Sequence, residues 1–164
     1  MPQLGYTVGR DVAVDITTPT GKLRIPKIMT FDAKPQVSNQ KITPLNGVSD
    51  ELQIPTGWNG TITAERMDGT LDDFWAQRED NYTNGIDHQR GTITESITDS
   101  NGTTSLYRYE GVSFHPTESG NKPGEKTVSQ TLSVTANRRA QVNYGSVRAK
   151  VTAHETAQPA TAAA

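Results

Sequence analysis

One segment near the C-terminal end, residues 127–137, limits the possible folds of this chain more than any other. Its side chains divide strictly by position, with Val128, Leu132, Val134 and Ala136 on one parity and Thr127, Ser129, Thr131, Ser133 and Thr135 on the other. Because successive side chains of a strand point to opposite faces, this period of two predicts a β-strand with one buried face and one hydroxyl-lined face. The chain must therefore build a sheet whose outer face is polar but uncharged.

The same alternation recurs earlier in the chain. It is seen over residues 12–16, 58–65, 91–98 and 103–114, and less regularly over 142–151. Turn signals rich in Pro, Gly, Asn and Asp separate several of these segments, as expected between antiparallel strands. We therefore predict a mainly β fold, a β-sandwich or barrel of about seven strands with one flanking α-helix.

That helix is predicted over residues 71–83. Thr70 is a suitable N-cap, Asp73 resembles its capping-box partner, and Asn84-Gly85 is typical of a left-handed helix end. The face expected to pack on the sheet carries Leu71, Phe74, Trp75 and Tyr82. The alternative is an aromatic ligand platform.

Between the first strands and Trp58 the alternation is lost, over residues 32–56. This stretch holds three prolines and isolated apolar residues. Its candidate functional residues are Lys34, Pro35, Val37, Ile42, Leu45, Val48 and Leu52. Proline cannot donate a hydrogen bond to a sheet, which favours a long extended loop over a central strand. Connections of this length inside a domain are commonly functional.

Composition excludes several classes of protein. The 164 residues suit a single domain, which we place at 1–156, followed by an Ala/Thr/Pro-rich disordered tail at 157–164. There is no cysteine, and no apolar run approaches the roughly 20 residues of a membrane-spanning helix. No secretory signal is visible, so the default compartment is the cytoplasm. Apolar residues, Tyr included and Gly left out, make up only 32% of the chain, which is low for a soluble domain.

Catalytic and cofactor motifs are not found in the sequence. The three histidines lack a second metal-type ligand nearby, and Asp72 and Asp73 fit a helix N-terminus better than acid–base catalysis. We therefore expect no enzyme activity, no metal and no cofactor. A cationic group near the C-terminus, formed by Arg138, Arg139, Arg148 and Lys150, suits a protected strand edge better than a phosphate site. A monomeric carbohydrate- or protein-binding module, with Trp58, Trp75, Tyr82 and Tyr107 as its platform, remains an alternative.

The positive signal is the set of hydroxyl rows. With 23 Thr in the chain, β propensity alone can explain them. The functional interpretation is a wet sheet face with few cations, past which a polyanion can slide.

The order and spacing of these segments resemble those in the tail tube proteins of tailed bacteriophages, especially the contractile-tail type. The resemblance covers roughly residues 8–151 and rests on Thr-Ile-Thr-Ala-Glu-Arg at 61–66, Gly-Thr-Leu-Asp-Asp-Phe-Trp at 69–75, Leu-Tyr-Arg-Tyr-Glu-Gly-Val-Ser-Phe at 106–114, and Lys-Thr-Val-Ser-Gln-Thr-Leu-Ser-Val-Thr-Ala-Asn-Arg-Arg at 126–139.

The resemblance implies a structural virion protein that assembles into stacked hexameric rings, in which each subunit adds strands to an inner β-barrel. Double-stranded DNA would pass non-specifically through the lumen into the host, and residues 32–56 would reach the adjacent ring. The lumen-facing candidates are Thr61, Thr63, Glu65, Thr92, Thr94, Ser96, Thr127, Ser129, Thr131 and Ser133. Implied partners are further copies of the chain, the tail sheath, a baseplate or tube initiator, the tape measure and the tail terminator, with no membrane and with assembly in the host bacterial cytoplasm. A related contractile secretion or injection system is the alternative setting.

Overall fold

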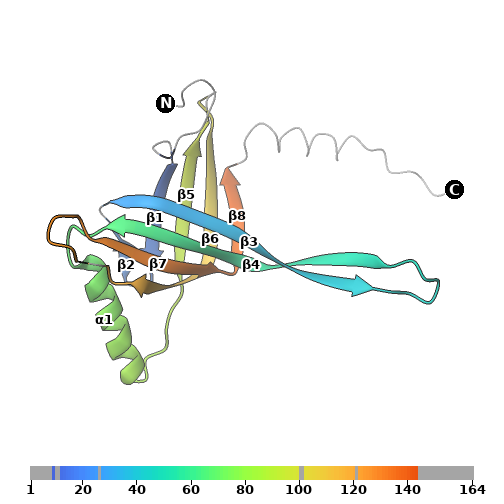
Figure 1. Cartoon of the computed structure of the whole chain (residues 1–164), viewed down its shortest axis with the longest axis horizontal. Coiled ribbons are helices and arrows are strands. Elements are labelled where there is room, and N and C mark those ends of the chain that lie inside the picture. Colours follow the sequence, from blue (N-terminus) through green and yellow to red (C-terminus); the bar gives the residue numbers. More distant parts are fainter. Residues whose placement is uncertain (1–8, 10–11, 26, 100–101, 121, 144–164) are drawn as a thin grey trace.

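The computed structural model describes residues 9, 12–25, 27–99, 102–120 and 122–143 (Figure 1). Within them the chain forms eight β-strands and one α-helix. In chain order these are β1 (Val12–Thr18), β2 (Gly21–Leu23), β3 (Ile28–Ile42), β4 (Asp50–Glu65), α1 (Thr70–Thr83), β5 (Gly91–Thr98), β6 (Thr104–Glu118), β7 (Ser129–Ala136) and β8 (Arg138–Asn143). The predicted mainly β fold with a single flanking helix is confirmed.

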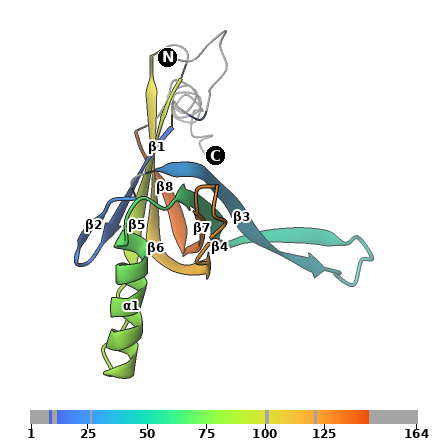
Figure 2. The same ribbon diagram turned by 60° about the vertical axis from the view of Figure 1, so that its left-hand side comes forward.

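All eight strands belong to one antiparallel sheet, in the order β2-β1-β5-β6-β7-β4-β3, with β8 also paired to β6. Strand β6 belongs to two parts of this sheet, because its first half pairs with β5 and β8 and its second half pairs with β7. We call β1, β2, β5, β8 and the first half of β6 the β5 sector, and β3, β4, β7 and the second half of β6 the β4 sector. The two sectors cross one another in Figures 1 and 2, and the described strands form no closed barrel.

A bulge and a one-residue corner let the chain pass between the sectors. Gly111 is the extra residue of β6 where its pairing with β5 shifts register, and its φ of +64° suits glycine. A Cβ there would lie 2.5 Å from the side-chain Nδ2 of Asn137. Asn137 itself is the only residue between β7 and β8, and its N–H donates to the carbonyl of Glu110 at 3.0 Å. Bulge and corner thus interlock at the junction of the two sectors.

The core lies between the facing sides of the two sectors. Its buried apolar residues are Ile16, Ile62, Ala64, Ile93, Tyr109, Val112, Phe114, Leu132, Val134 and Ala136. Leu132, Val134 and Ala136 are therefore buried as the alternation predicts. The rings of Phe31 and Trp58, from the β4 sector, each meet the ring of Tyr109 edge-on at 5.7 Å between centroids. The two sectors are held together by packing across this shared core.

Residues 32–56, expected to form an irregular loop, instead belong to a long β-hairpin. Strands β3 and β4 pair continuously out to Ile42 and Asp50, so only residues 43–49 form the turn. Pro35 and Pro55 are accommodated because β3 pairs with β4 alone, and β4 pairs with β7 only from Trp58 onward. Each proline thus lies on a strand with one open edge, where a missing N–H need not break a ladder.

Helix α1 begins differently from the prediction. Thr70 is its first residue and not its N-cap; Gly69 holds the cap position and makes no side-chain cap hydrogen bond. The side chain of Asp68 takes over this role, because its Oδ1 accepts the N–H of Thr70 at 3.1 Å. The other end matches the expected left-handed stop, with Gly85 at φ +71°.

We expect Asp68→Ala to lower the melting temperature by a few degrees at pH 7, while Asp68→Asn, which keeps an acceptor, changes it little. The hydrogen bonds from Thr70 hold the pKa of Asp68 below its ordinary value of 3.8. A carboxyl group with a lowered folded-state pKa stabilises the protein above the unfolded pKa and loses this effect as the pH falls through the folded pKa. Thermal melts from pH 7 to pH 2 should therefore show the gap between wild type and Asp68→Ala shrinking; a gap that widens toward acid contradicts this capping role.

The last strand begins earlier in the chain than the sequence predicts. It is β8, Arg138–Asn143, and begins before the expected 142–151. Residues 144–151 and the predicted tail at 157–164 lie outside the described residues.

Candidate assembly surfaces

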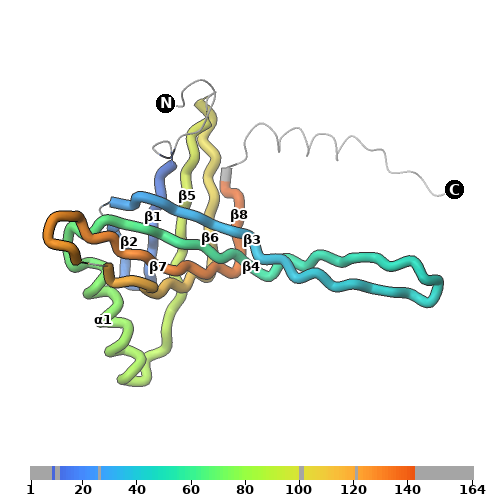
Figure 3. The backbone as a smooth tube through the Cα atoms, viewed as in Figure 1, coloured from blue at the N-terminus to red at the C-terminus, as the bar shows by residue number. Residues whose placement is uncertain are grey.

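The outer half of the β3–β4 hairpin projects from the body of the molecule. Beyond Gln36 and Gly57 the two strands pair only with each other, because β7 contacts β4 no further than Trp58. Figures 1 and 3 show this arm extending to one side, far from α1. We call residues 36–56 the hairpin arm. It contributes nothing to the core that the two sectors share.

A bulge marks the root of the hairpin arm. Gln36 pairs with Gly57 and Val37 pairs with Pro55, which leaves Thr56 as the extra residue. The hydroxyl of Thr56 donates to the carbonyl of Gln36 at 3.1 Å and stabilises the bulge. Bulges increase strand twist, and Figure 1 shows the two ribbons crossing at this point.

The two faces of the hairpin arm differ in chemistry. In an antiparallel pair, residues opposite each other share a face. The pairs Ser38–Ile54, Gln40–Leu52 and Ile42–Asp50 therefore place Ile42, Leu52 and Ile54 on one face, and these three side chains are 42–49% exposed. The other face carries the pairs Asn39–Gln53 and Lys41–Glu51, and the apolar pair Val37–Pro55 at the root of the arm. One side of the arm is thus an apolar surface that nothing in the described chain covers.

The tip of the arm presents a second apolar group on an ordered turn. Leu45 is fully exposed and Val48 is 69% exposed. The N–H of Gly47 donates to the carbonyl of Pro44 at 3.0 Å, and the N–H of Val48 donates to the side chain of Asn46 at 3.2 Å. The turn is therefore built by its own hydrogen bonds, although its apolar side chains face solvent.

The predicted hydroxyl rows divide between the two sectors. On the β4 sector, Thr61 is opposite Ser133, Thr63 opposite Thr131, and Glu65 opposite Ser129. These side chains are half-buried or exposed and lie on the face away from the core, and Thr127, just before β7, is also exposed. The hydroxyl of Ser129 donates to Oε1 of Glu65 at 2.8 Å. The same face also carries Asp32 opposite Thr61, His115 opposite Ser133 and Glu118 opposite Thr131, so ionisable side chains flank this hydroxyl row.

The hydroxyl row on β5 has different neighbours. Thr92 and Thr94 are opposite Glu110 and Arg108 on β6, and Thr94 is also opposite Asp15 on β1. Ser96 pairs with Leu106. This row therefore has both acidic and basic neighbours, whereas the charged neighbours of the row on the β4 sector, Asp32, Glu65 and Glu118, are acidic. Because the sectors pack core to core, their outer faces point away from each other, and the two rows form separate surfaces.

Helix α1 covers one end of the core only in part. Leu71 and Phe74 pack against the core, and the rings of Phe74 and Phe114 are 5.6 Å apart. The guanidinium of Arg78 donates to the carbonyl of Phe114. Tyr82 was expected to pack on the sheet, but it is 85% exposed, so that expectation is wrong. The helix extends past the edge of the sheet, and its last turn has no sheet beneath it (Figure 1).

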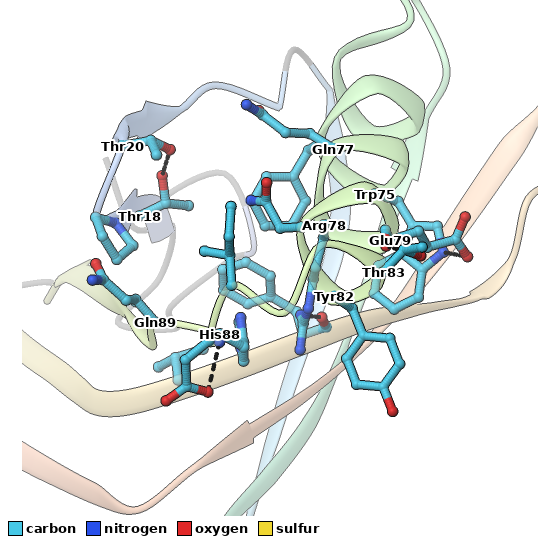
Figure 4. A pocket seen from close by; sticks show the side chains of 18 residues that line it. Thr18, Thr20, Trp75, Gln77, Arg78, Glu79, Tyr82, Thr83, His88 and Gln89 are labelled. Atoms are coloured by element: carbon cyan, nitrogen blue, oxygen red, sulfur yellow. Dashed lines mark hydrogen bonds between the residues drawn. The ribbon is translucent and has the colours of Figure 1, made fainter.

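A groove of about 830 Å³ lies beside this overhanging helix. Its walls are α1, the β1–β2 turn around Pro19, and the segment 86–91, with Phe114 also among its lining residues (Figure 4). Burial, followed by the positive charge of Arg78, lowers the pKa of His88, whose Nε2 lies 3.2 Å from the hydroxyl of Ser113. Ile86 and Tyr82 contribute exposed apolar surface to the groove. We call it the helix groove.

The four aromatic residues considered as a ligand platform do not form one surface. Arg139 lies over Tyr107 at 3.8 Å and over Trp58 at 4.8 Å, measured from its guanidinium carbon to each ring centroid. Trp75 and Tyr82 instead belong to the helix groove. Arg139 thus stacks within the protein as a cation–π partner, and Arg148 and Lys150, the other expected members of a basic group, lie outside the described residues.

Asp72, one of the two helix carboxylates, has a structural role. Its Oδ2 accepts from Nε of Arg66 at 3.1 Å and its Oδ1 accepts from the buried amide of Gln130 at 2.9 Å. Among the described residues there is no cluster of three or more metal-ligating side chains. The same part of the chain contains no helix of the length and hydropathy that a bilayer crossing requires.

Comparison with known proteins gives matches at the level of structure alone. No protein-family model matches the sequence, and no curated protein matches it. A chain of an extracellular contractile injection system, the PVC sheath–tube complex in its extended state, aligns with a TM-score of 0.55 and 12% identity over 86% of this chain and 95% of that chain. A chain of the anti-feeding prophage baseplate, six-fold symmetrised, aligns with a TM-score of 0.53 and 8% identity over 84% and 96%.

The SPP1 tail tube also aligns, with a TM-score of 0.53 and 12% identity over 90% of this chain and 86% of that chain. At sequence identities this low, the structural matches show a shared fold alone. The alignments nevertheless span nearly the whole described chain and most of each matched chain. This chain has the fold of the tube proteins of phage tails and contractile injection systems.

Proposed function

We propose that this protein is a structural virion component that assembles with copies of itself into stacked hexameric rings, forming the inner tube of a phage tail. The observation that carries this is the hairpin arm, which holds exposed apolar side chains outside the body of a tail-tube fold. Exposed apolar surface of this kind marks interaction sites. The six-fold symmetrised baseplate among the structural matches supports the ring order.

Physical features of the chain favour such assembly. Among the described strands β3 pairs with β4 alone, and a neighbouring subunit that paired with its other edge would cover it. A head-to-tail interface closes into a ring when its rotation permits, and stacked rings give an open tube. Partner contacts would also stabilise a chain with few apolar residues through mass action.

The outer face of the β4 sector is our candidate for the lumen. Its cross-strand pairs Thr61–Ser133 and Thr63–Thr131 are uncharged, so they offer DNA phosphates few cations to hold. Thr127, Ser129 and Glu65 would also lie on this surface, and the register adds the side chains of Asp32, His115 and Glu118 to it. The row Thr92, Thr94 and Ser96 faces away from it and would lie on the outside or between subunits.

In this setting the hairpin arm reaches the adjacent ring, and Lys34 and Pro35 precede it on β3. The sheath, a baseplate or tube initiator, the tape measure and the tail terminator are the expected partners, and double-stranded DNA passes through without sequence recognition. The assembled protein would belong to the virion tail and form in the host bacterial cytoplasm.

A tube of a related contractile injection system is the second candidate, favoured by the match to the PVC sheath–tube complex. The two settings differ in cargo and share the same subunit assembly. Particles purified from the native source would distinguish them, since only a phage tail joins a DNA-filled capsid.

The purified full chain tests the proposal. At high concentration it should sediment as rings or longer assemblies and show hollow rings or tubes by negative-stain electron microscopy. A chain that stays strictly monomeric at all concentrations, with no particles on the grid, would contradict it.

A further inference from the structure

The helix groove is an apolar recess that the described chain leaves open. Phe74 and Phe114 are among its lining residues, and the exposed side chains of Ile86 and Tyr82 add apolar surface to it. Figure 4 shows Thr18, Thr20 and Gln89 on one side of it and α1 on the other. A recess of this size accepts several side chains at once.

The turn at the tip of the hairpin arm has the opposite shape. Residues 43–49 project Leu45 and Val48 on a turn fixed by hydrogen bonds from Gly47 and Val48. The turn carries no charged residue. It can therefore enter an apolar recess without burying an unpaired charge, and its preformed shape limits the entropy lost on docking.

The two features cannot meet within one molecule. In Figures 1 and 2 the hairpin arm extends to one side while α1 lies at the opposite, lower side of the body. A protrusion and a recess on different sides of one chain are the requirement for a heterologous contact that repeats from copy to copy. Every copy brings one of each, so the two surfaces are always present in equal number.

We propose that the Leu45 turn of one subunit seats in the helix groove of a neighbouring subunit. This inference rests on the proposed self-assembly and adds to it the receiving surface. Leu45 and Val48 pack against the apolar lining, and Asn46 and Thr43 lie near the polar rim formed by Arg78, His88 and Gln89. The contact gives both the exposed tip and the exposed end of α1 a partner.

Cysteine cross-linking tests the contact directly, because the native chain has no cysteine. The test variants are Leu45→Cys/Ile86→Cys and Leu45→Cys/Gln77→Cys, whose second positions line the groove. The matched control is Leu45→Cys/Val142→Cys, since Val142 is an exposed apolar residue on β8 outside the groove. Disulfides form only when Cα atoms come within about 7 Å.

Under mild oxidation the groove pairs should convert monomer into a ladder of linked oligomers on denaturing gels, while the control pair should remain monomeric. Groove pairs that stay monomeric in preparations containing normal tubes would overturn the inference and leave the proposed function standing. A small molecule found in the groove by native mass spectrometry of assembled protein would also overturn it. If neither wild type nor any variant forms assemblies, the proposed function itself fails.

Discussion

Shortening the hairpin arm should abolish tube formation while leaving the domain folded. The cleanest deletion removes residues 38–42 together with 50–54, five cross-strand pairs, and joins the existing turn to the Val37–Pro55 pair. The body should be unaffected because these residues pair only with each other and lie outside the core. We expect a melting temperature within a few degrees of wild type, with rings and tubes lost from electron micrographs.

Two substitution sets separate the chemistry of the arm from its length. Replacing Ile42, Leu52 and Ile54 by threonine keeps β propensity but removes the apolar face, so stacking should be lost. Replacing Asn39 and Gln53 by threonine on the opposite face is the matched control and should leave tubes intact. Normal tubes from the shortened arm would show that the arm has no role in assembly.

Truncating Phe114 should cause the largest loss of stability of any single change considered. Phe114 is 4% exposed, lies on β6 where the two sectors meet, and contacts the ring of Phe74 on α1. Deleting a buried phenyl ring removes its transfer free energy and leaves a cavity, which costs about 3–5 kcal/mol. Phe114→Ala should therefore sharply lower the urea midpoint and reduce assembly by depleting folded subunits.

The docking of α1 should be especially sensitive to this change. The helix has no buried residue, so its docking depends on the packing of Leu71 and Phe74. It also depends on the hydrogen bond from Arg78 to the backbone of Phe114 and on those that Asp72 accepts from Gln130 and Arg66. Phe114→Leu, which refills most of the volume, should recover much of the lost stability. Equal midpoints for wild type and Phe114→Ala would contradict the core described above.

The sequence predicts the strands that have one face buried in the core, because burial of one face requires apolar and polar residues to alternate. Buried positions alternate with half-buried or exposed ones along all of β7 and over residues 91–94 of β5, where the sequence predicts strands. The two strands of the hairpin arm could not be predicted in this way, because neither face of the arm packs against the body and no alternation is required. The apolar face of the arm is divided between two strands, with Ile42 on β3 and Leu52 and Ile54 on β4, so neither strand alone shows the full pattern.

Other departures have equally local causes. Helical spacing places Tyr82 on the same face as Phe74, but α1 extends beyond the sheet before Tyr82 is reached. The hydroxyl of Thr70 made it the obvious cap, yet Asp68, two residues earlier, provides the acceptor. The helix groove combines residues 70–91 with the β1–β2 turn and with Phe114, which are distant from them in sequence, so no local motif predicts it.

The lumen assignment depends on which sector faces inward, and the sequence does not decide this. Periodicity identifies the rows at Thr61 and Thr92 as equivalent wet faces. Only the packing of the sectors places them on opposite sides, and only the strand pairing shows which charged residues flank each row.

Cryo-electron microscopy of assemblies grown from the purified full chain alone tests the central claim most directly. The account predicts a hollow stack of six-subunit rings, with the Thr61–Ser133 face toward the lumen and each hairpin arm crossing to a neighbouring subunit. A monodisperse monomer, or an assembly in which the hairpin arm contacts no other copy, would contradict it.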